Sequence, residues 1–378
     1  MTDLVTVEDY RRKSRRVLPA VLYDHLEGGA GDESLLARNR DSLTAVRLRP
    51  RYLRDVSVRD QRTTLFGRQH SAPLAIAPTG LNGAIRPGGD VFLARAAARA
   101  GIPFVLSTPA QNTIEEVSRE ADGDLWFQLY VVERGLAEEL VARALAAGYS
   151  TLVLTVDVPV NGLRHRDRRN GFGLPLRMTP RILLDGARHP GWSTRFLRSG
   201  MPELANLTAS AATGTDAAHA LLRRQLDASF TWRDLAWLRR LWPHDLLVKG
   251  VLHPDDAARA VDCGADGIIV SNHGGRQLGE GPSTMEVLPG VLAKVDSPVL
   301  VDSGFRTGAD IVKAVCLGAS AVLIGRAALY GLAAGGEAGV DAVLDILRTE
   351  IDTTMSLIGA TRIADLDRTY VQLPASWH

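Results

Sequence analysis

Eight short apolar runs recur along the chain, and they constrain its fold more than any other feature. They are residues 74–78, 104–108, 126–130, 151–157, 246–250, 267–272, 299–304 and 321–326. Each lacks the polar alternation of a half-exposed strand and is typical of a parallel strand buried on both faces. Helical patterns lie between the runs, and a glycine repeatedly closes the helix before the next run. Eight such units predict an α/β fold, a (β/α)8 TIM barrel, rather than an open doubly wound sheet.

The rest of the chain fits around this barrel as one domain, residues 1–378. Residues 1 to about 70 predict helices and a small hairpin, and a long amphipathic helix follows Gly336. The interval after the fourth run, about 158–245, is far longer than an ordinary strand–helix unit. An insertion of this length is more often functional or mobile than inert.

Composition excludes several classes of protein. The 378 residues are 46% hydrophobic and carry a formal net charge of +1, which fits a large core and gives no footprint for nucleic acid. The two cysteines, Cys263 and Cys316, lie among small apolar residues, so buried thiols are expected and neither a zinc site nor a disulfide. No His/Cys grouping has metal-ligand spacing, so no metal is expected.

The N-terminal residues and the insertion bear on location. Residues 1–16 contain no apolar core of a signal peptide, and no stretch approaches the roughly 18 apolar residues of a spanning helix, so a cytoplasmic protein is expected. Residues 174–215 mix arginines with large apolar residues. That mixture fits an anionic membrane surface, and it equally fits an active-site lid or an oligomer contact.

Polar residues collect where the predicted strands end. They are Gln128, Tyr130, Asp157, Lys249, Ser271, His273, Asp302 and Arg326. The carboxyl ends of the strands are the face on which barrel enzymes build their active sites, so this asymmetry predicts an enzyme.

Two loops suggest what that enzyme binds. SNHGGRQL (271–278) places a His and an Arg in a glycine-rich loop, which indicates acid–base chemistry beside an anion. The loops at 302–308 and 325–326 carry Arg306 and Arg326 with glycine amides, and they predict a phosphate site. Neither a dinucleotide fingerprint nor a P-loop is present in the sequence.

Two further side chains have alternative roles. Lys249 fits either a Schiff base or a point charge that stabilises an anion. Asp157 fits either a turn cap or a carboxylate that holds His273 in one tautomer.

These motifs together resemble one family. SNHGGRQL, the VKG before it, and DSGFRTGADIVKA and LIGRAALYGLA after it are similar to the FMN-dependent 2-hydroxy acid oxidases and dehydrogenases. The resemblance also covers APTGLNGA, WFQLYVV and LTVDVPVNG, and so nearly the whole chain. It implies oxidation of an (S)-2-hydroxy acid to the 2-keto acid with FMN as cofactor. Within the family, the mandelate-oxidising branch is the most similar, which implies an aromatic substrate such as mandelate.

The resemblance implies a role for each matching residue. His273 is the expected base, with Asp157 and Tyr130 as catalytic partners. The expected substrate-binding residues are Tyr23, Tyr130, Arg164, His273 and Arg276. The expected FMN-binding residues are Pro78, Thr79, Gly80, Ser107, Gln128, Thr155, Lys249, Ser271, Asp302, Ser303, Gly304, Phe305, Arg306, Gly325 and Arg326.

Gly80 bears on the electron acceptor, because the oxidase branch usually has alanine there. The resemblance therefore implies a dehydrogenase that passes electrons to a quinone-like acceptor. It also implies a homotetramer and peripheral contact of 174–215 with the inner face of the cell membrane. The alternatives are an O2-using oxidase of lactate, glycolate or 4-hydroxymandelate, a Lys249 Schiff-base lyase, and a flavin-binding protein without catalysis.

Overall fold

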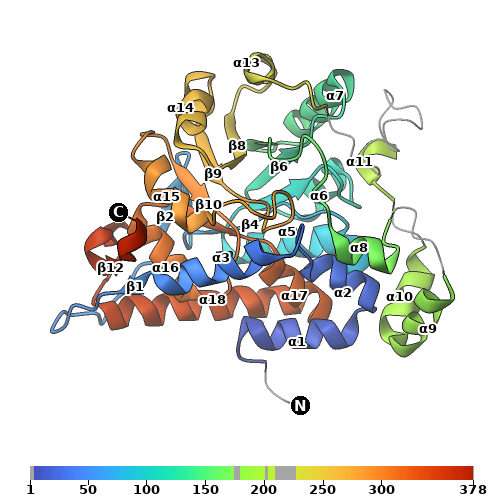
Figure 1. Cartoon of the computed structure of the whole chain (residues 1–378), viewed down its shortest axis with the longest axis horizontal. Helices are drawn as coiled ribbons and strands as arrows, with labels where there is room; N and C mark the ends of the chain where they lie inside the picture. The colour runs from blue at the N-terminus through green and yellow to red at the C-terminus, as the bar shows by residue number, and fades with distance from the viewer. Residues whose placement is uncertain (1–3, 174–178, 201–202, 209–226, 378) are drawn as a thin grey trace.

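A closed barrel of eight parallel strands forms the centre of the molecule (Figure 1). The computed structural model describes residues 4–173, 179–200, 203–208 and 227–377. The barrel strands are β4 (Leu74–Ile76), β5 (Phe104–Ser107), β6 (Leu125–Leu129), β7 (Thr151–Thr155), β8 (Asp245–Val251), β9 (Gly267–Val270), β10 (Val299–Val301) and β11 (Ala321–Ile324). They pair in chain order, and β11 closes the ring on β4 through Leu323 opposite Ala75. The predicted barrel and all eight of its strands are confirmed.

Apolar side chains fill the inside of the barrel and close its amino end. Val105, Leu247 and Leu300 belong to a fully buried interior cluster. The hairpin of β2 (Thr63–Leu65) and β3 (Arg68–His70) adds Phe66 to this cluster, edge-on to Trp126 at 6.0 Å between ring centroids. With the amino end plugged, the carboxyl end is where the barrel can open to a ligand.

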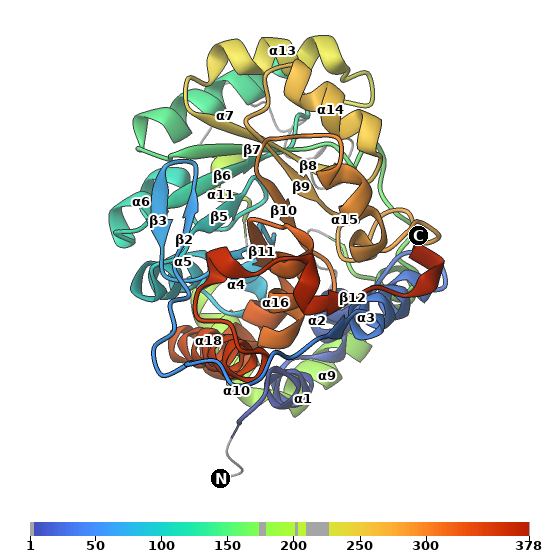
Figure 2. The same cartoon turned by 90° about the vertical axis from the view of Figure 1, so that its left-hand side faces the viewer.

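Helices surround the barrel and bury the outward faces of the strands (Figure 2). The helices that follow barrel strands are α4 (Asn82–Ile85), α5 (Gly89–Ala100), α6 (Ile114–Glu120), α7 (Arg134–Ala146), α14 (Pro254–Asp262), α15 (Thr284–Leu292), α16 (Gly308–Leu317) and α17 (Arg326–Gly335). The terminal segments supply α1 (Val7–Val17), α2 (Ala20–Glu27), α3 (Ser34–Ala45), α18 (Glu337–Ile358) and the strand pair β1 (Arg47–Leu48) with β12 (Val371–Gln372). The predicted N-terminal helices, hairpin and long C-terminal helix are confirmed.

The insertion between β7 and β8 contains five described helices. They are α8 (His165–Asn170), α9 (Pro180–Arg188), α10 (Pro190–Ser199), α11 (Ala205–Thr208) and α13 (Trp232–Leu241). The indole Nε1 of Trp192 donates to the carbonyl of Ala84 over 2.9 Å, and Asp185 accepts from the backbone N–H of Ala20 over 2.6 Å. Because α2 and α4 border the open end of the barrel, these bonds fix the α9–α10 pair beside it. None of the described helices is long and apolar enough to cross a membrane.

Candidate active site

Side-chain alternation along the strands places polar groups at the open end. Leu247 and Ile269 point into the barrel interior. Since residues two apart share one face of a strand, Lys249 and Ser271 continue these rows at the carboxyl end. The same step of two residues leads from interior residues of other strands to Ser107, Gln128, Thr155 and Asp302. An apolar plug is therefore capped by a polar layer.

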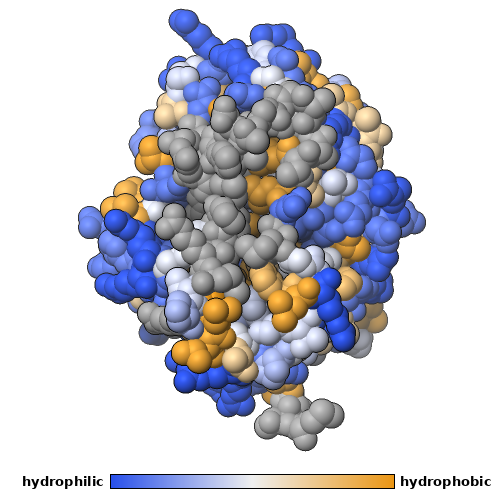
Figure 3. All heavy atoms as spheres, turned by 90° about the vertical axis from the view of Figure 1, so that its right-hand side faces the viewer, coloured by the Kyte–Doolittle hydropathy of each residue, from blue (hydrophilic) through white to orange (hydrophobic). Residues whose placement is uncertain are grey.

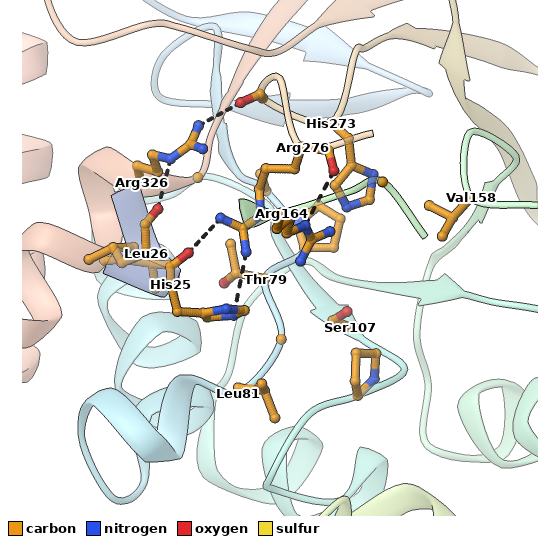
Figure 4. A pocket seen from close by; sticks show the side chains of 18 of the residues that line it. His25, Leu26, Thr79, Leu81, Ser107, Val158, Arg164, His273, Arg276 and Arg326 are labelled. Atoms are coloured by element: carbon orange, nitrogen blue, oxygen red, sulfur yellow. Dashed lines mark hydrogen bonds between the residues drawn. The ribbon is translucent and has the colours of Figure 1, made fainter. Parts of the chain in front are cut away.

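A cavity of about 520 Å³ lies above this layer (Figure 4). The predicted site residues that line it are Pro78, Thr79, Gly80, Ser107, Tyr130, Arg164, Lys249, His273, Arg276, Asp302, Ser303, Gly304, Phe305, Arg306, Gly325 and Arg326. Those that stand outside the lining are Tyr23, Gln128, Thr155, Asp157 and Ser271. Gln128 and Ser271 contact lining residues, since Ser107 donates to Gln128 over 2.8 Å and Lys249 donates to Ser271 over 2.9 Å.

His273 and Asp157 form a partly buried pair at the cavity wall. His273 Nδ1 lies 3.0 Å from Asp157 Oδ1, and its Nε2 lies 3.3 Å from the hydroxyl of Tyr130. Burial lowers the pKa of His273, and the attraction of Asp157 only partly offsets it. Burial alone would raise the pKa of Asp157, but His273 and Lys249 outweigh it and the pKa is lowered. The pair is therefore a neutral imidazole on an ionised carboxylate, with Nε2 as the basic atom.

The backbone at His273 is strained in a way that aims this imidazole. His273 has φ +57°, in the left-handed region that a residue with a side chain rarely adopts. Three hydrogen bonds hold the turn: Ser271 Oγ accepts from the N–H of His273, and Ser303 Oγ accepts from those of Asn272 and Gly274. Gly274 and Gly275 also have positive φ, which explains the two adjacent glycines of the motif.

Two guanidinium groups face the same cavity. Arg164 Nε donates to the carbonyl of Arg276 over 3.2 Å, so the two arginine-bearing loops are tied together. Gly162 permits this approach, because a Cβ there would lie 2.4 Å from the carbonyl oxygen of Arg276. Two guanidiniums beside a basic imidazole suit a ligand with two parts. The guanidiniums bind an anionic group such as a carboxylate, and the imidazole accepts a proton from a group next to it.

Lys249 is a buried cation. Its Nζ lies 3.2 Å from Asp302 Oδ2 and 2.9 Å from Ser271 Oγ. Burial alone would lower the pKa of Lys249, but the charges of Asp302 and Asp157 outweigh it and the pKa is raised. With its pKa raised, Lys249 is protonated near neutral pH and acts as a point charge rather than as an amine nucleophile.

Another guanidinium, that of Arg326, lines the cavity at the end away from His273. Arg326 donates to the carbonyls of Leu26, Gly274 and Gly28, and all three acceptors are neutral. Burial lowers the pKa of its guanidinium. Arg306 also lines this end. A partly buried guanidinium that donates to neutral carbonyls retains its charge for an anion, and a phosphate supplies one.

These features fit FMN. Its phosphate suits the Arg326 end, and its polar ring edge suits side-chain atoms that are buried without a hydrogen-bond partner among the described residues. Those atoms include Thr79 Oγ1, Gln128 Nε2 and Thr155 Oγ1. Lys249 would place a positive charge beside the ring, and the Pro78–Gly80 backbone and Leu323 would supply apolar contact.

The structure places Tyr23 away from the cavity. It packs in the hydrophobic core, whereas His25, two residues later, lines the cavity with Leu22 and Leu26. Residues two apart on a helix lie about 200° around the axis from each other, so both cannot face one cavity. The i, i+3, i+4 spacing of Leu22, His25 and Leu26 is the sequence signal that identifies the inward stripe.

Comparison with known proteins agrees with this geometry. Residues 14–373 match the family described as FMN-dependent dehydrogenase. The chain belongs to the FMN-dependent dehydrogenases. It is 54% identical over 370 residues to (S)-mandelate dehydrogenase of Pseudomonas putida, covering 98% of this chain and 94% of that protein. L-lactate dehydrogenase of Caulobacter vibrioides is 44% identical, with 96% of each chain covered.

Solved structures show the same relationship. The crystal structure of the monotopic membrane protein (S)-mandelate dehydrogenase superposes with a TM-score of 0.96 at 54% identity, covering 99% of this chain and 100% of that one. A mandelate oxidase structure superposes with a TM-score of 0.82 at 36% identity, with 98% of this chain and 100% of that one covered. The predicted family and the predicted FMN cofactor are confirmed.

Proposed function

We propose that this FMN-dependent dehydrogenase oxidises an (S)-2-hydroxy acid to the 2-keto acid. The observation that carries the proposal is the convergence of His273 Nε2 with the guanidiniums of Arg164 and Arg276 on one cavity. A 2-hydroxy acid presents a carboxylate next to its reacting carbon. The two guanidiniums can therefore bind the carboxylate while His273 Nε2 lies close to the reacting carbon.

Each residue then has a defined task. Arg164 and Arg276 bind the substrate carboxylate, and the Tyr130 hydroxyl orients the substrate hydroxyl. Oxidation removes two electrons and two protons from the H–C–O–H unit. His273 Nε2 accepts one proton, and the other would leave together with the two electrons to bound FMN. Asp157 stabilises the imidazolium that forms.

The cofactor contributes the redox chemistry. FMN, when bound, accepts the two electrons that leave the substrate. Lys249 holds positive charge at the base of the cavity, where it would stabilise negative charge on the reduced ring. The backbone of Asp302–Arg306 and of Gly325–Arg326 would bind the phosphate, and Ser107, Gln128, Thr155 and Ser271 would bind or support the ring.

The substrate we propose is aromatic, with (S)-mandelate as the first candidate. The outer cavity is lined by apolar side chains that would bury a phenyl group: Leu81, Ala84, Ile85, Val158, Phe172 and Leu204. Burying an aromatic ring contributes roughly 2–3 kcal/mol of affinity. A lactate methyl group would fill little of this wall.

We also propose that reoxidation uses a quinone-like acceptor rather than O2, with Gly80 as the residue that sets this preference.

The protein would act at the inner membrane face as a homotetramer, with 1–378 as one domain and 158–245 as its insertion. Leu183, Leu184 and Leu197 on α9 and α10 are 54%, 65% and 80% exposed, and Arg188 and Arg198 are exposed beside them. Figure 3 looks onto the side that carries these helices and shows hydrophobic patches among hydrophilic side chains. The predicted contact segment 174–215 includes 174–178, 201–202 and 209–215, which lie outside the described residues.

The test uses the purified holoenzyme. Under nitrogen, (S)-mandelate should bleach the flavin absorbance, with lactate, glycolate and 4-hydroxymandelate as comparisons and (R)-mandelate as the stereochemical control. Bleaching by none of these acids would refute the proposed reaction. Faster bleaching by lactate than by mandelate would refute the aromatic substrate alone. Rapid reoxidation by air with peroxide release would favour the oxidase instead.

A further inference from the structure

The cavity contains a second Asp–His pair, on the side opposite His273. His25 Nδ1 lies 3.0 Å from Asp167 Oδ2, the same spacing that joins His273 to Asp157. The His25 ring stacks on Phe172 with centroids 3.9 Å apart and planes 19° apart. Its Nε2 lies 3.4 Å from Nη2 of Arg276 (Figure 4). The imidazole is thus held at one nitrogen and on one face, and its other nitrogen is directed at the arginine.

Hydrogen-bond chemistry fixes the protonation state that this geometry requires. A guanidinium has donors and no acceptor, so Nε2 of His25 must accept from Arg276. A neutral imidazole that accepts at Nε2 carries its proton on Nδ1, which donates to Asp167. Burial alone would raise the pKa of Asp167, but the bond from His25 and the charges of Arg276 and Arg164 outweigh it, so the pKa is lowered. An ionised Asp167 favours this tautomer.

Backbone carbonyls at the end of α2 and just beyond it hold the same guanidinium. Nη1 of Arg276 donates to the carbonyl of His25 over 2.5 Å and to that of Gly28 over 2.9 Å. These backbone contacts fix one corner of the group, and they would survive any change of the His25 side chain. The imidazole contact at Nη2 is the second point, and two points define the plane of the guanidinium. Two-pronged binding of a carboxylate depends on that plane.

We propose that Asp167 and His25 form a positioning relay that orients Arg276 for the substrate carboxylate. This proposal rests on the proposed oxidation of a 2-hydroxy acid and adds a residue that sets substrate affinity. His25 acts through Arg276, whereas the chemistry stays with His273. Loss of the relay therefore weakens binding of the acid and leaves the rate of the bound complex nearly unchanged.

Two matched substitutions distinguish loss of the hydrogen bond to Arg276 from loss of side-chain volume at position 25. His25→Gln places an amide oxygen near the position of Nε2, where it accepts from Arg276. His25→Asn reaches only the position of Nδ1. We expect the KM for (S)-mandelate to rise about 5- to 30-fold in His25→Asn, as for loss of one hydrogen bond to a charged group, and less than threefold in His25→Gln. The kcat should stay within about threefold in both variants, measured per bound flavin.

Asp167→Asn tests the other half of the relay without touching His25. An Asn amide that donates to Nδ1 forces the proton onto Nε2, which then points a donor at Arg276. We expect the same rise in KM and in the Kd of phenylacetate, read from the shift of the flavin bands. The neutral substrate mandelamide is the control, since it lacks the carboxylate, and its KM should not change in any variant.

The outcomes are distinguishable. Oxidation of no 2-hydroxy acid by the unsubstituted holoenzyme overturns the proposed function. Normal oxidation with equal KM values for His25→Asn, His25→Gln and the unsubstituted enzyme overturns the relay alone. An equal loss of acid and amide binding also overturns it, because a general disturbance of the cavity does not distinguish the two ligands.

Discussion

Asp157 Oδ1 lies 3.0 Å from Nδ1 of His273, and this contact determines which imidazole nitrogen faces the substrate. Asp157 comes from the end of β7 and His273 from the loop after β9, so the barrel and not the local sequence brings them together. The ionised carboxylate accepts a hydrogen bond from Nδ1–H, so the proton stays on Nδ1 and Nε2 is left as the base. The same contact stabilises the positive charge that His273 acquires during the reaction.

Replacing Asp157 with Asn should therefore lower kcat steeply while substrate binding changes little. An Asn amide can donate to Nδ1, which places the proton on Nε2 and removes the base. We expect a loss of about 100- to 10,000-fold in kcat. Steady-state kinetics measures it, and the Kd of phenylacetate is the control because that ligand needs the arginines and not the base. A loss of less than tenfold would show that Asp157 does not select the tautomer.

The pH dependence of kcat/KM should report a His273 that titrates below its usual value of 6.5. Burial lowers the pKa of His273, and a base is active above its pKa, so activity should persist below pH 6.5 before it falls. Asp157 raises this pKa, so in Asp157→Asn the acid limb should move to still lower pH while the plateau drops. A limb that moves upward in the variant would contradict the assignment.

Lys249 should be needed for stability as well as for redox chemistry. Lys249→Met leaves the buried carboxylate of Asp302 without its ion pair, and breaking such a pair costs about 3–5 kcal/mol. We expect a lower midpoint of thermal unfolding and less stabilisation of the reduced flavin. The double variant Lys249→Met with Asp302→Asn should recover part of the stability. Borohydride added with substrate should not inactivate the enzyme through Lys249, because the raised pKa keeps its amine protonated.

The barrel was predictable because its strands are buried on both faces and leave continuous apolar runs. Polar residues at the ends of those runs, such as Lys249 and Asp302, were predictable for the same reason, since strand ends meet at one edge of the barrel. The helix α2 was harder. The resemblance assigns Tyr23 to the substrate. The spacing of Leu22, His25 and Leu26 marks the stripe that lines the cavity, but only the packing of α2 shows that this stripe faces inward.

Contacts between loops that are distant in the chain could not be predicted from the sequence. Nothing local to Gly162 indicates that its Cα packs against the backbone of Arg276, 114 positions later. The pairing of His25 with Asp167 depends on how α8 of the insertion packs on α2, and the spacing of these residues along the chain gives no sign of it. Long insertions lack the repeated strand–helix pattern from which the barrel was predicted.

Gly80 should control the reaction with oxygen. Replacing it with Ala adds a methyl group whose carbon would lie 2.9 Å from Cγ of Pro109, so the β4 and β5 loops must shift apart by a few tenths of an ångström. Both loops border the proposed ring site, and we expect faster peroxide formation on reoxidation in air. Peroxide yield per turnover is the measurement, and a small drop in the unfolding midpoint should accompany it. Unchanged peroxide formation would remove Gly80 from the explanation of acceptor choice.

Exposed leucines on α9 and α10 should anchor the protein to a membrane. Placing glutamate at Leu183, Leu184 and Leu197 removes three apolar contacts and adds negative charge that an anionic surface repels. We expect the variant to move from the membrane fraction to the supernatant and to lose binding to anionic vesicles, with (S)-mandelate kinetics in a soluble dye assay unchanged. Each of the three single variants is compared with Leu357→Glu as its control, because Leu357 is 69% exposed on α18, away from this face. Equal release by these variants and by the control, or recovery of the unsubstituted protein wholly in the supernatant at low salt, would contradict the anchor.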